Sequence, residues 1–293
     1  MGGAQKDLAI GTVLGDIMRR AADEVARTEA PALADEPDGV HQHRVRVRRL
    51  RSVLAGFEES FDTRQTERLR VAYAEWGSQL GVVRDIEVRA SVAAETLELA
   101  GIDDPAVVRR LVDSEREAYP VAHARLVELA ASPRAQERGR VLRRFVEEMH
   151  VVAHDSPATA VLAEVLRAQV KRVRKAERRL DDSAEQFHDL RKAARRARYV
   201  AEAIADAVPD FLPKPVQAIA EAGDDLHDAL GGHRDLTLLA RHARQEGARA
   251  AHAGQWSEDY ETLAALADDA AEDLLSDVGP AVRQLRAAAS DLP

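Results

Sequence analysis

One phrase of sequence occurs twice in this chain of 293 residues, and each copy has the spacing of a single helical face. The phrase is His-x-x-Arg-x-x-x-Arg-Arg-x-Arg, and its copies begin at His41 and at His188. On an α-helix, the His and the Arg at +3, +7 and +10 lie within an arc of roughly 80°. Apolar residues take the opposite side, for example Leu50 in the first copy and Leu190 in the second. The chain is therefore predicted to contain two equivalent helices, each with a core side and an arginine side.

A second repeat follows each copy of the phrase. Leu-Gly-x-x-Arg-Asp occupies residues 80–85, and Leu-Gly-x-His-Arg-Asp occupies residues 230–235. The duplication predicts two halves, residues 1–155 and 156–293, each a small four-helix bundle. If the halves pack about a pseudo-two-fold axis, the two arginine sides face one shared basic cleft. Asp85 and Asp235 are expected to form structural ion pairs that hold arginines of the phrase in position.

Helical periodicity extends over nearly the whole chain, and aromatic residues are only 4% of it, so an all-α fold of about eight to ten helices is predicted. Gly101 is expected to end a long helix that bends near residues 77 and 81, and Asp104-Pro105 to begin the next, with a break near Pro120. Ser132 and Ser156 have the pattern of N-caps followed by proline. Helices are expected at about 6–30, 63–99, 157–181, 184–207, 214–230, 233–253 and 257–275, with one after a polar link at 31–39 and a short last one from about 280.

The basic residues are concentrated in a protein that is acidic as a whole. The net charge is −9, yet segments 41–51, 167–179 and 188–198 hold 17 of the 42 Lys and Arg, with only Glu177 and Asp189 against them. A general nucleic-acid coat is more often basic throughout, because long-range attraction to phosphates supplies its affinity. Concentrated charge on an acidic body indicates a focused anion site instead.

Arginine suits an anion site because guanidinium stays ionised and can donate two parallel hydrogen bonds to one phosphate. The alternative is a solvated helix face that pairs with acids, which are nearly absent from both stripes. For the helix at 167–179 a second wall of the site and an exposed face stay equally open, and each phrase's histidine can contact the ligand or be buried. The candidate anion-binding residues are His41, Arg44, Arg48, Arg49, Arg51, Arg167, Lys171, Arg174, Lys175, His188, Arg191, Lys192, Arg195, Arg196 and Arg198.

Several classes of site lack their sequence signals. The chain has no cysteine, which excludes disulfides and thiolate metal sites. Histidine pairs such as His41-x-His43 occur, but no His-Glu-x-x-His or three-ligand cluster does, so neither a metal nor a cofactor is expected. No Walker loop, dinucleotide-binding turn or nucleophile elbow is present. Without a leader or a run of ~20 apolar residues, the expected location is the cytoplasm, with no membrane contact.

These motifs make the sequence similar to the CHAD family, the conserved-histidine α-helical domain. Residues 40–51 resemble its first signature, residues 187–202 its second, and the Leu-Gly repeats the helices that follow. The resemblance covers nearly the whole chain and implies two four-helix subdomains around a positively charged channel that binds inorganic polyphosphate. His43 and Arg195 depart from the apolar residue and the lysine that are more usual. No Glu-x-Glu-x-Lys motif of the CYTH triphosphatase partner occurs, so a stand-alone CHAD protein is expected.

The expected function is non-enzymatic binding of polyphosphate. Association with polyphosphate granules is one expectation, and recruitment of polyphosphate to other machinery is another. A hydrolase of polyphosphate or triphosphate is the first alternative, although the sequence offers neither a nucleophile nor a carboxylate set for it. RNA or DNA binding is the second, and it is disfavoured because Tyr199 is the only aromatic residue beside a basic stripe.

Overall fold

The structure is a computed structural model that describes residues 8–152, 154–181 and 183–293. As predicted, it is all-α, and the described residues contain only two isolated β-bridges, Ala9–Pro157 and Phe61–Val151. No helix in these ranges is both long enough and apolar enough to cross a bilayer. The helices are α1 (Ile10–Leu33), α2 (Gly39–Gly56), α3 (Thr63–Ala100), α4 (Pro105–Val108), α5 (Ser114–Ala130), α6 (Pro133–Glu148), α7 (Ala158–Glu177), α8 (Ala184–Ala207), α9 (Pro213–His252), α10 (Asp259–Leu274) and α11 (Val278–Ser290), with 3-10 turns at Glu58–Ser60 and Leu275–Asp277 and a π-helical turn at Arg109–Asp113.

Several predicted helix ends are confirmed by their capping geometry. Gly101 follows α3 with φ 66°, a left-handed conformation that glycine adopts without steric cost. Asp104 caps α4, because its carboxylate accepts a hydrogen bond of 2.8 Å from the Ala106 N–H. Ser132 caps α6 in the same way by accepting from the Ala135 N–H at 3.3 Å.

Other predicted boundaries are wrong. The helices expected at 214–230 and 233–253 form the single helix α9, because neither Gly231 nor Gly232 adopts a positive φ. The break expected at Pro120 does not occur, since α5 continues through that position. Helix α3 is continuous through residues 77 and 81, as expected, and the bend there stays a prediction. Ser156 does not cap α7, and its carbonyl accepts from the Ile10 N–H instead. The first helix begins at Ile10 and includes Pro31; residues 6 and 7 of the expected helix lie outside the described residues.

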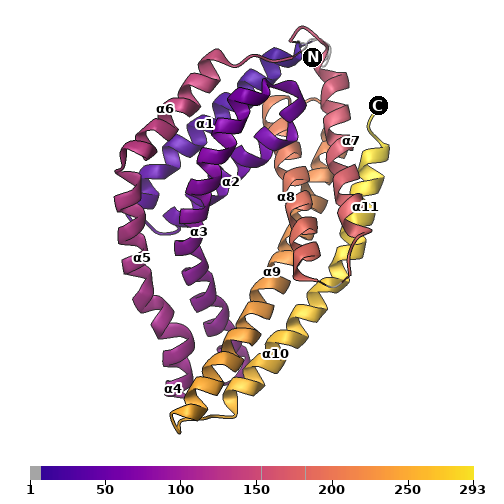
Figure 1. Cartoon of the computed structure of the whole chain (residues 1–293). Helices are drawn as coiled ribbons and strands as arrows, with labels where there is room; N and C mark the ends of the chain where they lie inside the picture. The colour runs from indigo at the N-terminus through magenta and orange to yellow at the C-terminus, as the bar shows by residue number, and fades with distance from the viewer. Residues whose placement is uncertain (1–7, 153, 182) are drawn as a thin grey trace.

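The helices form two sides that meet at both ends of the molecule (Figure 1). Helices α1, α2, α3, α5 and α6 make one side, and α7 to α11 make the other. At one end α2 packs against α8, and at the other α3 packs against α9 and α10. A large core, which includes Leu50 and Leu190, fills the first end, and a smaller core around Leu97 and Leu263 fills the second. Both cores draw on residues before and after position 155, so the subdomain boundary there stays a prediction.

Candidate anion-binding site

The arginine sides of α2 and α8 contribute to one pocket. Leu50 and Leu190 are fully buried on the opposite sides, as the periodicity predicts. The pocket has a volume of about 330 Å³ and is called the basic pocket here. It is lined by Arg48, Arg51, Ser52 and Ala55 of α2, by Glu67, Arg70, Val71 and Ala74 of α3, and by Lys192, Arg195 and Arg196 of α8. Both copies of the duplicated phrase therefore supply cations to the same hollow.

Arg48 and Arg195 carry charges that the protein does not neutralise. Neither forms an ion pair with a carboxylate in the described ranges, and the Nε atom of each is buried without a hydrogen-bond partner. Burial, together with the nearby charges of Arg48 and Arg191, lowers the pKa of Arg195 to about 9. Burying like charges without an acid costs free energy, and a bound anion would offset that cost.

The glycines of the second repeat leave room for two arginines of the phrase. A Cβ atom added to Gly231 would lie 3.0 Å from Nη2 of Arg191, and one added to Gly81 would lie 3.7 Å from Nη2 of Arg44. Nη2 of Arg44 forms an ion pair with Oδ1 of Asp85 on α3, at 3.3 Å. The same geometry thus recurs in both halves of the sequence: an arginine of the phrase passes over a glycine of the following long helix.

The two aspartates of the second repeat behave differently. The ion pair between Asp85 and Arg44 confirms the prediction for Asp85. Asp235 forms its ion pair with the adjacent Arg234, at 3.8 Å, rather than with an arginine of the phrase. Burial raises the pKa of Asp235, while the charge of Arg191 opposes that rise. The second aspartate therefore acts on Arg191 through its field and not through direct contact.

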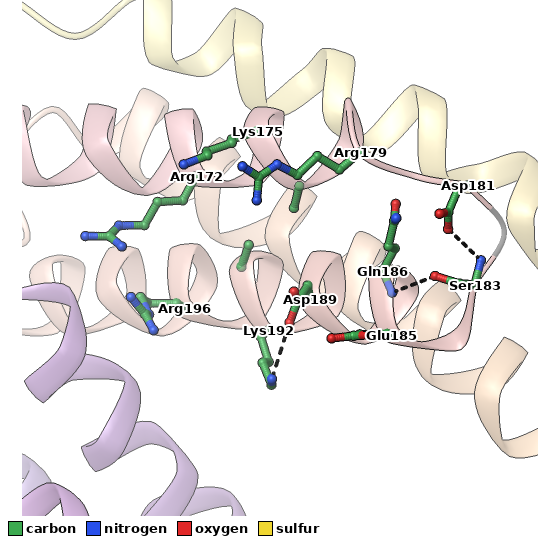
Figure 2. A pocket seen from close by; sticks show the side chains of 12 residues that line it. Arg172, Lys175, Arg179, Asp181, Ser183, Glu185, Gln186, Asp189, Lys192 and Arg196 are labelled. Atoms are coloured by element: carbon green, nitrogen blue, oxygen red, sulfur yellow. Dashed lines mark hydrogen bonds and ion pairs between the residues drawn. The ribbon is translucent and has the colours of Figure 1, made fainter.

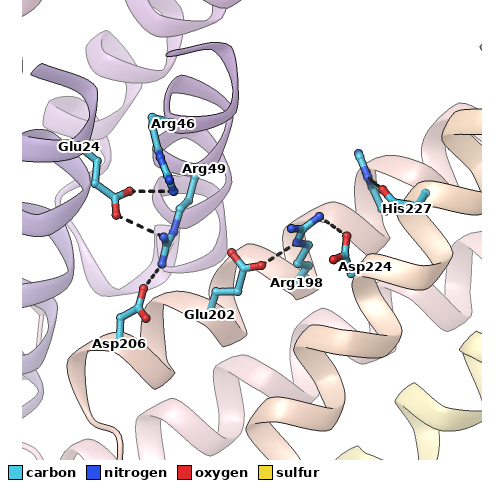
Figure 3. A network of polar contacts seen from close by, with 9 residues as sticks. Glu24, Arg46, Arg49, Arg198, Glu202, Asp206, Asp224 and His227 are labelled. Carbon is cyan, nitrogen blue, oxygen red and sulfur yellow. Dashed lines mark hydrogen bonds and ion pairs between the residues drawn. The ribbon is translucent and has the colours of Figure 1, made fainter. Parts of the chain in front are cut away.

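Carboxylates already hold the candidate residue Arg49 and its neighbour Arg46 (Figure 3). Arg49 is only 9% exposed and binds Glu24 of α1 and Asp206 of α8. Its neighbour Arg46 also contacts Glu24, at 3.6 Å. These pairs tie α2 to helices on both sides of it. Because carboxylates neutralise the charges of Arg46 and Arg49 locally, these two side chains should attract an anionic ligand less strongly than Arg48 does.

Arg198 is also neutralised within the protein. It donates to Glu202 at 2.7 Å and to Asp224 of α9 (Figure 3). Tyr199, which the sequence left as a candidate for base stacking, is 2% exposed and packs in the core. The last position of the second phrase therefore connects α8 to α9, and the aromatic ring beside it is out of reach of a ligand.

The histidines that begin the two phrases lie at the edge of this cationic region. Burial and the charge of Arg84 lower the pKa of His41. Burial and the charge of Lys192 lower the pKa of His188, whose side chain is exposed. Both rings are consequently neutral near pH 7 and can donate one hydrogen bond each to an anion. Whether they contact a ligand stays a prediction.

His43 has a structural role that the sequence did not reveal. The ring is fully buried and accepts at Nε2 from the Trp76 Nε1–H, at 2.9 Å. Nδ1 must then carry the proton and donate to Thr28 Oγ1, also at 2.9 Å, because neutral imidazole has one donor and one acceptor. Burial lowers the pKa of His43 to about 4. Its pairing with His41 as a metal ligand, considered from the sequence, is not available in this geometry.

His227 is a further residue that sequence reasoning missed. The side chain is buried, and its Nε2 atom has no hydrogen-bond partner. Arg191 donates to its carbonyl oxygen at 3.4 Å. Burial lowers the pKa of His227 to about 4, and nearby arginines oppose its protonation further. Only the three-dimensional packing of α8 on α9 brings this ring to the arginines, since nothing in the local spacing marks it.

His227 also belongs to the one group of possible metal ligands found among the described residues. The ligand atoms of Asp224, His227 and Asp228 lie within 4.8 Å of one another. Two of these groups are already engaged, because Asp224 binds Arg198 and Asp228 lies 3.1 Å from Nδ1 of His227. The surrounding guanidinium charges would also oppose a cation, so this cluster does not fit a metal well.

The cations of α7 lie outside the basic pocket. Arg167, Lys171, Arg174 and Lys175 line a separate groove of about 780 Å³ between α7 and α11. The helix packs beside α8, as expected from its place in the sequence. However, these four residues line the groove toward α11 and none of them lines the basic pocket, so their contact with a ligand stays a prediction.

Comparisons with known proteins place the chain in a family. The model of the CHAD domain matches residues 16–244. Two uncharacterised proteins from two strains of Mycobacterium tuberculosis are each 28% identical over 263 residues, which cover 86% of this chain and 49% of those proteins. The chain thus spans about half the length of these curated relatives.

Two solved structures share the fold. The crystal structure of the CHAD domain from the plant Ricinus communis has a TM-score of 0.67 at 22% identity, with 99% of this chain and 94% of that chain covered. PptA from Streptomyces chartreusis has a TM-score of 0.63 at 21% identity, with 97% and 100% covered. Together with the match to the family model over most of its length, these similarities show that the chain belongs to the CHAD domain family.

Proposed function

We propose that this protein binds inorganic polyphosphate in the basic pocket and does not hydrolyse it. The observation that carries the proposal is the pair of unneutralised arginines, Arg48 and Arg195, one from each copy of the phrase. Membership of the CHAD family supports the same ligand. A polyanion would supply the negative charge that this pocket lacks, and each charge-assisted hydrogen bond to it would be stronger than a neutral one.

The proposed contacts are a subset of the candidate residues. Arg48, Arg51, Lys192, Arg195 and Arg196 line the pocket and would donate directly to phosphate oxygens. The arginines that pass over glycines, from the same two phrases, would add charge beside them. Arg49 and Arg198, whose carboxylate partners lie on neighbouring helices, would instead fix the helices. The recurrence of this arrangement after each phrase supports our inference that two pseudo-symmetric halves enclose a basic central cleft.

Polyphosphate fits the pocket better than nucleic acid does. It offers charged oxygens but no base, and the described residues that line the pocket include no aromatic side chain. Single-stranded nucleic acids gain much of their affinity from bases that stack on aromatic rings. A ligand recognised through phosphate alone therefore matches the chemistry of the lining. Association with polyphosphate granules in the cytoplasm follows as part of the proposal.

A hydrolytic enzyme is the less favoured reading of the same pocket. Among the described residues, the lining has one carboxylate, Glu67, and one hydroxyl, that of Ser52. A two-metal or covalent mechanism needs a set of metal ligands or an activated nucleophile. Guanidinium groups hold substrate and product phosphates alike, and uniform binding does not accelerate a chemical step. Binding without turnover is therefore the proposed activity.

A competition experiment tests the ligand. Fluorescently labelled polyphosphate of about 60 units would be bound to the protein at fixed ionic strength, and unlabelled polyphosphate or single-stranded RNA of equal charge would be added. We expect polyphosphate to displace the label at least tenfold more effectively than RNA does. Equal displacement by RNA would favour a nucleic-acid-binding module, and no binding of the label would refute the proposal.

A further inference from the structure

The groove between α7 and α11 is a second concentration of unpaired positive charge, called the outer groove here. Its lining contains no acidic side chain among the described residues, and its cations are Arg167, Lys171, Arg174, Lys175, Arg178, Arg179 and Arg286. Of these side chains, only that of Arg167 donates a hydrogen bond to another described residue, to the Leu292 carbonyl at 3.3 Å. None forms an ion pair with a carboxylate in the described ranges.

The outer groove and the basic pocket are joined by a third hollow. A groove of about 590 Å³ lies between α7 and α8, and its lining includes Arg172 and Lys175 of α7, Arg179 just after α7, and Arg196 of α8 (Figure 2). Lys175 and Arg179 line this groove and the outer groove as well. In turn, Arg196 and Lys192 line this groove and the basic pocket. Shared cations thus connect all three hollows in one continuous basic track.

The acidic residues that line the α7–α8 groove either lie at one end of it or are paired with a cation. Asp181 and Glu185 line the α7–α8 groove only at the end where the two helices are connected (Figure 2). Asp189 pairs with Lys192 at 3.3 Å. The part of the groove that faces the basic pocket has Arg172, which Glu58 holds at 3.5 Å, and Arg196, which forms no ion pair in the described ranges. A polyanion that extends from the basic pocket would therefore pass along the cations of α7 before it reached the acidic side chains next to the connection between α7 and α8.

The charge on α7 exceeds what a helix end requires. Cations in the last turn stabilise the helix dipole, which accounts for Arg174 and Lys175. It does not account for Arg167, which lies about 16 Å along the axis from Arg178, nor for Arg286 on the neighbouring helix. Like charges spaced four residues apart on one helix face destabilise it. This cost, in a protein with a net charge of −9, indicates a ligand for the groove.

We infer that the outer groove holds the continuation of the polyphosphate chain whose first units occupy the basic pocket. The inference rests on the proposed function and extends it to chain length. Short chains would fill the basic pocket alone, whereas long chains would cross the α7–α8 groove and reach α11. Affinity for long chains would then depend on cations that short chains never touch.

The test compares two matched triple variants. Lys171→Gln/Arg174→Gln/Arg178→Gln removes three charges from the outer groove. Arg64→Gln/Arg68→Gln/Arg143→Gln removes three from a separate groove between α3 and α6, whose lining shares no residue with the track. Both variants change the net charge of the chain equally, so a general weakening of long-range attraction would affect them equally.

Dissociation constants would be measured for polyphosphate of about 10 and about 100 units over a range of salt concentrations. For the outer-groove variant we expect at least a tenfold loss of affinity for the long chain, a salt slope smaller by about 2, and short-chain affinity within twofold of wild type. The control variant should keep the wild-type preference for long chains. Each variant would be checked for folding by circular dichroism.

Other outcomes would overturn the inference in distinguishable ways. If both triple variants lose the same affinity, net charge and not the groove determines binding of the long chain. If the outer-groove variant binds long and short chains as wild type does, the groove is not part of the path. Wild-type protein that binds neither chain would instead refute the proposed function itself.

Discussion

Replacing Arg195 with methionine should stabilise the free protein while weakening polyphosphate binding. Burial and neighbouring arginines lower the pKa of Arg195 to about 9, so keeping it charged near pH 7 costs free energy in the fold. Because a tenfold change in an ionisation constant corresponds to about 1.4 kcal/mol, the cost is at most about 5 kcal/mol. Solvent at the pocket mouth screens the charge, and about 1–3 kcal/mol is the expected gain from Arg195→Met. Methionine keeps most of the buried stem, so little packing is lost.

The assay is thermal unfolding at pH 7, paired with polyphosphate titration. A gain of 1 kcal/mol should raise Tm by about 2–4 °C in a protein of this size class. The matched control is Arg49→Met in α2, where the guanidinium is buried but bound to Glu24 and Asp206. That variant should lose about 1–3 kcal/mol because two carboxylates are left unpaired. The affinity should fall about tenfold or more for Arg195→Met and much less for Arg49→Met.

The two variants separate a ligand-binding arginine from a structural one. The cost of the Arg195 charge to the free energy of folding should also diminish at high pH. A lowered pKa means that the folded protein releases this proton first, so the destabilisation by Arg195 is complete at pH 7 and diminishes as pH rises above about 9. If Arg195→Met lowers Tm as much as Arg49→Met does, Arg195 stabilises the fold and the reasoning about an unneutralised pocket fails.

Three further predictions concern the site and its surroundings. Gly231→Ala should weaken polyphosphate binding about three- to tenfold, because the added methyl group displaces Arg191. The control Gly139→Ala, whose methyl group would make only ordinary contacts, should bind as wild type does, and equal polyphosphate titration curves for the two variants would refute this. Burial lowers the pKa of His43 from 6.5 to about 4, so up to roughly 3 kcal/mol of stability, present above pH 6.5, should be lost as pH falls toward 4. The double variant His43→Leu/Trp76→Phe should therefore show a flatter dependence of Tm on pH, and an unchanged dependence would count against this role of His43. Finally, phosphate-release assays with polyphosphate, triphosphate or ATP, with or without Mg²⁺ or Mn²⁺, should stay at background, and turnover that survives stringent purification would favour an enzyme.

The sequence predicted those features that depend on neighbours along one helix. Periodicity identified the core and arginine sides of α2 and α8, and the bounds of α8 agree with the expected 184–207. Local capping signals also predicted the end of α3 at Gly101 and the start of α4 after Asp104. Each of these depends on contacts within a few residues, which a single sequence contains.

What the sequence could not predict depends on contacts between distant segments. Arg49 has the same place in its phrase as Arg196, yet only Arg49 meets Asp206. The glycines at 231 and 232 suggested a break, but close approach by Arg191 and by Leu274 explains them within a continuous α9. The periodicity of α7 likewise showed that its cations share a face without showing that the face is turned toward α11.

The salt dependence of polyphosphate binding by wild type and by Arg48→Glu/Arg195→Glu tests the central claim most directly. If six phosphates are neutralised, the log–log slope of the wild-type association constant should be roughly −4, at about 0.7 per phosphate of a flexible single chain. The double variant should keep its helical circular dichroism and lose binding, because two charge-assisted contacts are replaced by repulsion. A wild-type affinity that does not change with salt, or a folded double variant that binds normally, would contradict the claim that the duplicated arginine phrases form a polyphosphate site.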